Sequence, residues 1–386
     1  MPILDSDPVP QGNRYDRMEW AGAFGDLGTL IPFVVAYIGV LKLNPFSVLI
    51  AFGASMLVCG LYYKTPFPVQ PMKAIGAVAI TQAAQTAIVT PAAVYSAAFV
   101  TGILWLGLGL SGLMSRVARM VPPTVVLGIS LGLGFSFMLQ GISMMQTNWP
   151  VAVIGGLGTV LLMSNQRIPA MFVLLAFGIV VGAVQQPDIL SQLTFSTIGF
   201  VAPAFAWGEM TWNALFVGGV LLALPQIPLT LGNAVIAIKE ENNRLFPHRS
   251  VTENGVAVST GVMNLFSSFV GGVPMCHGAG GMAGHVAFGA KTGGALVILG
   301  GLLVVLALLF SSSVEVMFKL IPTAILGVIL FLTGTQLAAG SSVLPLEKSG
   351  RLVVLITAAF CTWNVAIGFV VGFALHHLNR KGWGRF

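Results

Sequence analysis

The 386-residue chain is poor in charge, since only 8% of its residues are Asp, Glu, Lys or Arg. A soluble domain carries about 25% charged residues, so this chain has too few to cover a water-facing surface. Hydrophobic residues make up 56% of the sequence, in apolar runs along nearly its whole length. This pattern excludes a globular enzyme with one anchor and predicts an all-α polytopic membrane protein.

The chain also lacks the sequence patterns of several other functions. Its three cysteines, Cys59, Cys276 and Cys361, are scattered and give neither a disulfide framework nor a metal spacing. It has no phosphate-binding Walker loop and no recognisable Ser/His/Asp set, so we expect a protein that is not an enzyme and has no cofactor. The net charge of +6 does not predict nucleic-acid binding, because the basic residues fall at the ends of apolar segments.

Fourteen segments are long enough to cross a membrane, or to half-cross it in pairs. We expect them at residues 21–40, 44–63, 70–86, 91–113, 122–144, 150–164, 168–184, 213–238, 251–269, 277–289, 293–310, 322–338, 351–363 and 365–378. With the N-terminus inside, fourteen basic residues fall on the cytoplasmic side and only Lys42 and Lys319 fall outside. This bias predicts a plasma or inner membrane protein with cytoplasmic tails at residues 1–20 and 379–386, and the polar first residues do not resemble a signal peptide.

The two halves of the chain resemble each other. RMVPPTVVLGISLGLGF (119–135) is similar to FKLIPTAILGVILFLTG (318–334), and QPMKAIGA (70–77) is similar to VPMCHGAG (273–280). The offset near 200 residues predicts two seven-span repeats, residues 21–200 and 201–378. An odd number of spans inverts the second repeat relative to the first, as in many secondary transporters. We expect the short, Gly/Pro-interrupted spans three and ten to be discontinuous half-helices.

Two half-helix N-termini that meet near the midplane would favour a compact anion, through their unpaired N–H groups and positive dipole ends. Ionisable residues within spans are functional candidates. Asp26 is a candidate coupling site or partner of Lys73, or else a helix cap or interfacial residue. Lys73 is a candidate anion ligand, or else a side chain that reaches the interface. His277 could bind substrate or titrate, or else be a neutral histidine bonded to backbone.

Amides in apolar spans need hydrogen-bond partners and are further candidates. Gln70 comes just before the first half-helix, and Gln226, Thr230 and Asn233 follow a spacing near 3.6 that places them on one helix face. We expect that face to line a cavity. Thr29 is a weaker candidate, because threonine often bonds its own helix backbone. A zinc site is not expected, because Cys276, His277 and His285 do not converge on one helical face.

Four stretches of the chain resemble signature stretches of the molybdate-transporter family, which belongs to the wider sulfate-permease clan. They are FGDLGTLIPFVVAYI (24–38), PVQPMKAIGAVAI (68–80), LPQIPLTLGNAVIA (224–237) and VPMCHGAGGMAGHVAFGAKTG (273–293). The resemblance implies the fourteen-helix fold shared with uracil permeases, in which a core (spans 1–4 and 8–11) moves against a gate (spans 5–7 and 12–14). It also implies molybdate uptake, with sulfate or tungstate as competitors, and a homodimer formed through the gate.

The resemblance places the substrate pocket between spans three and ten, with spans one and eight beside it. On this chain the pocket would then involve Asp26, Thr29, Gln70, Lys73, Gln226, Cys276, His277 and the backbone of Gly278, Ala279, Gly280 and Gly281. Thr230, on the same helix face as Gln226, is a further substrate-binding candidate. As ionisable residues within spans, Asp26 or His277 would be the site that couples transport to protons.

These observations together predict a secondary active importer of molybdate that works by alternating access. A sulfate or other anion permease of the same fold is the alternative, as is a passive anion channel. A nucleobase or organic-anion permease is disfavoured, because spans eight and ten carry no acid before Glu240 at the cytoplasmic end. A membrane-embedded enzyme would need a catalytic set that we do not recognise in the sequence.

Overall fold

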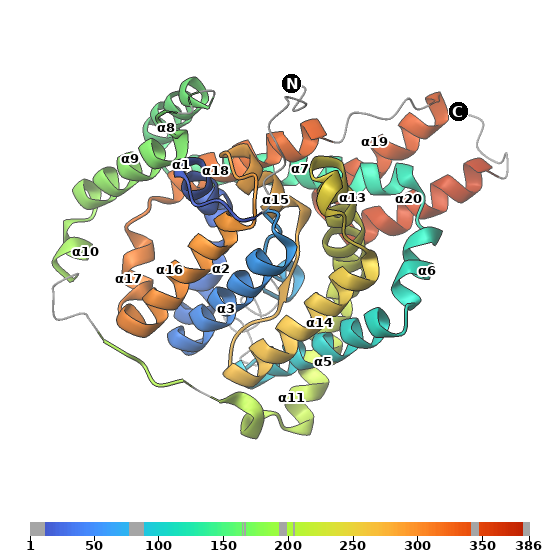
Figure 1. Ribbon diagram of the computed structural model, residues 1–386, viewed down its shortest axis with the longest axis horizontal. Coiled ribbons are helices and arrows are strands. Elements are labelled where there is room, and N and C mark those ends of the chain that lie inside the picture. The colour runs from blue at the N-terminus through green and yellow to red at the C-terminus, as the bar shows by residue number, and fades with distance from the viewer. Residues whose placement is uncertain are drawn as a thin grey trace.

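The computed structural model describes residues 12–76, 89–163, 165, 167–192, 199–203, 205–340 and 347–380. The predicted third span, residues 70–86, is therefore described only as far as residue 76. The described chain is almost entirely helical, and helices from both halves pack against one another (Figure 1).

The helices follow the order that the apolar segments predict. Those of the first half are α1 (Arg17–Ala23), the 3-10 turn η1 (Phe24–Asp26), α2 (Leu27–Gly39), α3 (Pro45–Tyr63), α5 (Pro91–Leu110), α6 (Leu113–Met120), α7 (Pro123–Met145), α8 (Trp149–Leu162), α9 (Ala170–Gln185) and α10 (Pro187–Gln192). Those of the second half are η3 (Ala206–Glu209), α11 (Trp212–Phe216), η4 (Val217–Ala223), α12 (Leu224–Leu229), η5 (Thr230–Ala237), α13 (Ile238–Leu245), η6 (Pro247–Arg249), α14 (Glu253–Val270), α15 (Ala279–Ala287), α16 (Gly294–Phe310), α17 (Val314–Lys319), α18 (Thr323–Gly340), α19 (Lys348–Trp363) and α20 (Val365–Arg380).

Several of these helices are long and apolar enough to cross a membrane. Within the described ranges they are Arg17–Gly39, Pro45–Tyr63, Pro91–Leu110, Pro123–Met145 and Trp212–Leu245. Shorter apolar helices cover Trp149–Leu162, Ala170–Gln185, Gly294–Phe310 and Thr323–Ala339. The predicted segments 44–63, 91–113 and 293–310 differ from α3, α5 and α16 by at most three residues at either end. The all-helical membrane architecture is thereby confirmed.

Local chemistry explains where the helices begin and end. Asn44 and Thr90 precede α3 and α5, and each side chain accepts a hydrogen bond from a backbone N–H of the first turn. A proline follows each cap, at a helix position that needs no N–H donor. In the second half, α14 ends at Gly271, whose φ of 74° lies in the left-handed region. The chain then continues in extended form toward the interior.

Span eight differs from the regular α-helix that the 3.6 spacing predicted. Residues 212–245 form one continuous helical segment, but η4 and η5 within it are π-helical. They flank α12, which contains Pro225 and Pro228. Proline lacks the N–H needed for the regular helical ladder, which accounts for the distortion, and π-turns occur frequently at functional sites.

Close helix crossings bring elements of the two halves together. In the described chain α7 packs against α18 and α19, α3 packs against α16, and α5 packs against α14. Gly141 and Gly327 face each other where α7 crosses α18, and a Cβ on either one would lie 2.7 Å from the carbonyl oxygen of the other. The crossing therefore requires glycine on both helices.

Candidate functional site

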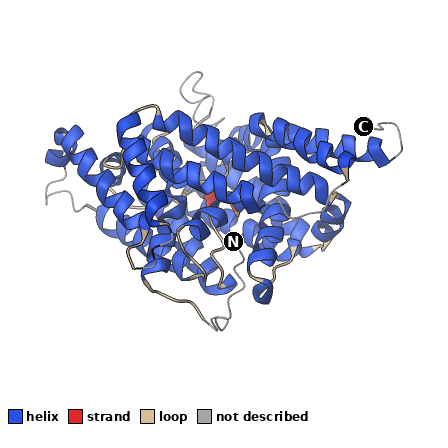
Figure 2. Cartoon of the chain, turned by 90° about the horizontal axis from the view of Figure 1, so that it is seen from above, coloured by secondary structure: helices blue, strands red, loops and turns tan. Residues whose placement is uncertain are grey.

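A short strand pair joins the two predicted half-helix regions. Strand β1 (Gln70–Pro71) pairs with β2 (Met275–Cys276) in antiparallel register, with Gln70 opposite Cys276. The pair lies in the interior, surrounded by helices (Figure 2). Helical structure begins at Lys73 after β1 and at Ala279 after β2. Because the strands are antiparallel, the two helices start from opposite ends of the pair.

Gln70 connects β1 to span one. Its Nε2 donates to Asp26 Oδ1 at 2.6 Å and to Thr29 Oγ1 at 3.0 Å. The Thr29 hydroxyl also bonds the Asp26 carboxylate. All three side chains are buried, and Asp26 begins α2 without making a side-chain capping bond. Its carboxylate instead accepts hydrogen bonds from Gln70 and Thr29. Asp26 is therefore not a simple helix cap, which was one of the alternatives.

Span eight contacts the starts of both helices. Gln226 Oε1 accepts from the backbone N–H groups of Ala74 at 2.9 Å and Ile75 at 3.4 Å. Its Nε2 donates to Thr230 Oγ1 at 3.0 Å. Asn233 Oδ1 accepts from Ala279 N at 3.3 Å, at the start of α15. Two amides on one helix therefore bond the first backbone N–H groups of both predicted half-helices.

A cavity of about 480 Å³ lies beside these groups. Thr29 and Lys73 line one part of it, Phe137 and Gln140 of α7 line another, and Asn364 between α19 and α20 also borders it. The contributions of α7 and Asn364 were missed in the sequence analysis. Gln140 could have revealed the contribution of α7, because this residue is an amide within an apolar span.

Lys73 is held by an aromatic ring rather than by a hydrogen bond. Its Nζ lies 3.7 Å from the centroid of the Phe137 ring, within cation–π range. Among the residues that the structure describes, this buried nitrogen has no hydrogen-bond partner. Asp26 interacts with Lys73 electrostatically, without forming an ion pair between described atoms. The lysine therefore retains donors for a ligand.

Both ring nitrogens of His277 bond other residues of the protein. The Nδ1 atom of His277 bonds Pro68 O at 2.7 Å, and its Nε2 bonds Ser259 Oγ at 2.8 Å. The ring also packs edge-on against Phe67. His277 precedes α15 rather than lying on its first turn. These contacts favour the alternative of a histidine satisfied by its neighbours.

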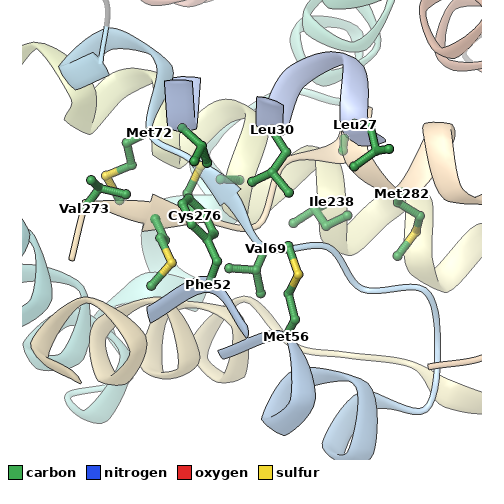
Figure 3. Packing of buried hydrophobic residues seen from close by; sticks show 14 of the residues in the cluster. Leu27, Leu30, Phe52, Met56, Val69, Met72, Ile238, Val273, Cys276 and Met282 are labelled. Carbon is green, nitrogen blue, oxygen red and sulfur yellow. The ribbon is translucent and has the colours of Figure 1, made fainter. Parts of the chain in front are cut away.

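Cys276 lies on β2 in an apolar cluster. Figure 3 shows it with Val69 and Met72, and all three side chains are buried. Beyond it, Gly278 and Gly281 lie directly against Gln70, so that a Cβ on either glycine would collide with its amide. These two glycines thus allow β1 to approach the start of α15.

His285 on α15 is a further buried polar residue that sequence reasoning did not select for the site. Its Nδ1 bonds Gly22 O at 2.8 Å, whereas its Nε2 has no partner in the described part of the chain. It also interacts electrostatically with Asp26. Its position inside an apolar span is the only signal that could have revealed it.

The architecture has counterparts among solved structures. The transmembrane domain of a cyanobacterium bicarbonate transporter, BicA, matches with a TM-score of 0.56 and 16% identity, over 94% of this chain and 99% of that one. Murine Solute Carrier 26 family member A9, an anion transporter in the inward-facing state, matches with a TM-score of 0.56 and 15% identity, over 99% of this chain and 70% of that one. The fold is therefore that of a membrane transporter of this structural class.

Sequence comparison identifies the family within this structural class of transporters. A family model described as "Molybdate transporter of MFS superfamily" matches residues 18–137 and 218–337, two ranges that begin 200 residues apart. Molybdate transporter 2 of Arabidopsis thaliana is 30% identical over 412 residues, which cover 94% of this chain and 87% of the relative. The chain belongs to the molybdate transporter family, as its four signature stretches predicted.

Proposed function

We propose that this chain is a secondary active importer of molybdate, a compact tetrahedral dianion. The observation that carries the proposal is the Lys73 ammonium. It is buried, faces a cavity of about 480 Å³ and has no hydrogen-bond partner in the described chain. A buried cation is costly unless it is paired, so this position favours a bound anion. Membership of the molybdate transporter family supports the choice of anion.

The remaining ligands would come from the two helix starts and the amides around them. The backbone from Gly278 to Gly281 opens α15, and the positive end of the helix dipole there would stabilise an anion, while Ala279 N already donates to Asn233. Gln70 and Gln226 would orient the oxyanion, since both are buried and already lie at these starts. We assign His277 to support, because it holds Pro68 next to α15.

Transport would proceed by alternating access in a fourteen-span, seven-plus-seven inverted repeat. The close packing of α7 with α18 and α19 supports a gate distinct from the core that carries the helix starts. A second cavity, of about 600 Å³, lies between the other ends of α7 and span eight, where Ser130, Ile236 and Lys239 border it. Both cavities lie between α7 and span eight. This arrangement supports a substrate path between core and gate. We further propose cytoplasmic termini and a dimer formed through the gate.

Protons are the coupling ion that the site favours. Asp26 has one carboxylate oxygen bonded to Gln70 and Thr29, while the other has no partner among the described residues. Lys73 and His285 both lie within its electrostatic reach. A carboxylate surrounded in this way links its protonation to the charge of the substrate site.

Calorimetric titration of the purified protein in detergent with molybdate tests the substrate. The titration is repeated in excess sulfate and then in excess tungstate. We expect molybdate binding that persists in sulfate and weakens in tungstate. Equal competition by sulfate would make the protein a general oxyanion carrier, and absence of binding for all three anions would overturn the proposal. Uptake into liposomes with and without an inward proton gradient then separates a coupled importer from a passive channel.

A further inference from the structure

One aromatic ring from α7 contacts both helix starts of the site. The Phe137 ring lies over the Lys73 ammonium, with 3.7 Å between nitrogen and centroid. The same ring packs on the first turn of α15, where a Cβ at Gly280 would lie 2.7 Å from Phe137 Cζ and closer still to Cε2. Phe137 and Lys73 also border the same 480 Å³ cavity. The ring therefore occupies the space directly beside the cation.

Among the residues that the structure describes, nothing accepts a hydrogen bond from the lysine. An ammonium group has three N–H donors, whereas an aromatic face offers a diffuse negative potential and no lone pair. An oxyanion supplies both charge and acceptor oxygens, so it is the better partner. An oxyanion in the cavity would approach the ammonium beside the ring, because Lys73 and Phe137 both line this cavity and the ring lies over the nitrogen.

We propose that Phe137 competes with the oxyanion for the Lys73 ammonium, so that the ring must leave Lys73 when the anion binds. This inference rests on the proposed function and adds a residue from α7, outside the predicted ligand set. Because α7 packs most extensively against α18 and α19, displacement of the ring would transmit site occupancy to that helix group. Phe137 thus lowers the affinity for the anion, and its displacement links anion binding to movement of α7.

The test compares molybdate affinity between matched variants by calorimetric titration of the full chain. Phe137→Leu keeps an apolar side chain but removes the ring, and Phe135→Leu makes the same change two residues away, at a position that is 40% exposed. We expect Phe137→Leu to bind molybdate roughly tenfold more tightly, the effect of a desolvated cation–π contact. Phe135→Leu should match the unaltered protein. Unchanged or weaker binding by Phe137→Leu would overturn the inference.

A double-substitution cycle isolates the competition. In a Lys73→Met background, Phe137→Leu should leave the remaining affinity unchanged, because no ammonium is left to release. If Phe137→Leu does not yield folded protein, 3,4,5-trifluorophenylalanine at position 137 keeps the shape and weakens the ring quadrupole. That protein should also bind more tightly, and equal affinity would refute the competition. Failure of the unaltered protein to bind molybdate would instead refute the proposed function, whatever the variants do.

Discussion

The side-chain oxygen of Gln226 accepts a hydrogen bond from the backbone N–H of Ala74, over a distance of 2.9 Å. The contact joins span eight to the helix that starts at Lys73, and its two residues lie 152 positions apart in the chain. Asn233, further along the same helical segment, makes a similar contact with Ala279. Span eight therefore holds both helix starts, and its two amides set the geometry of the site.

Replacement of Gln226 by alanine should destabilise the protein. The substitution leaves the N–H groups of Ala74 and Ile75 without their acceptor in a buried environment, at a cost of about 1–3 kcal/mol. We expect a lower thermal unfolding midpoint in detergent. Asn233→Ala serves as comparison and should cost less, because it removes one longer bond of 3.3 Å. An unfolding midpoint that stays the same in Gln226→Ala would argue against the capping role.

Loss of molybdate binding is expected for Gln70→Ala. The amide fixes the Asp26 carboxylate at 2.6 Å and lies against Gly278, so its removal disturbs both span one and the start of α15. Because this disturbs the pocket itself, we expect at least about a tenfold loss of affinity, or about 1.4 kcal/mol of binding free energy. Titration calorimetry measures the loss, with Gln185→Ala at the exposed end of α9 as control. Full affinity in Gln70→Ala would remove Gln70 from the pocket.

The sequence predicted the helices and the polar cluster better than it predicted individual roles. Helix positions follow from the lengths of apolar runs and from Pro and Gly at their ends, so α3 and α16 agree closely with expectation. Buried amides such as Gln70 and Gln226 were found because a polar group in an apolar span needs a partner. Their identification required no knowledge of the tertiary contacts.

Other roles depend on contacts that no local pattern reveals. His277 bonds Pro68 and Ser259, which lie 209 and 18 residues away, so the sequence could not distinguish a bonded histidine from a ligand. Phe137 is an apolar residue on an apolar helix and carries no signal at all. The π-helical turns of span eight likewise arise from packing and prolines rather than from a recognisable period.

The crossing of span one and α15 predicts a sharp difference between two glycines. A Cβ at Gly284 would lie 2.5 Å from the carbonyl oxygen of Gly25 and 3.0 Å from Thr333 Oγ1, whereas a Cβ at Gly301 would meet nothing within 4 Å. Backbone cannot yield easily, so Gly284→Ala should cost about 1–3 kcal/mol. Gly301→Ala, within α16, should be neutral or slightly stabilising, because alanine favours helix.

Thermal unfolding of the two alanine variants in detergent provides the measurement. A lower midpoint for Gly284→Ala alone supports the tight contact between the Asp26 region and α15. Equal midpoints for both variants would mean that the two elements are further apart than the structure places them.

The final prediction concerns coupling through Asp26. Asp26→Asn keeps an oxygen that can accept the hydrogen bond from Gln70 Nε2, so the local geometry should survive while the charge and the titratable proton are lost. We expect uptake into liposomes to lose its acceleration by an inward proton gradient. Exchange of external for internal molybdate should persist, because it requires no net proton movement.

Glu315→Gln is the matched control for this substitution. Glu315 pairs with Lys319 at 2.7 Å and is partly exposed, so its neutralisation costs little and leaves the buried cluster intact. The control should retain proton-driven uptake. If Asp26→Asn keeps both the transport rate and its pH dependence, then Asp26 has no coupling role, and His285 becomes the next residue to substitute. Its buried Nε2, which has no partner among the described side chains, is a further titratable atom within reach of this cluster, besides Lys73.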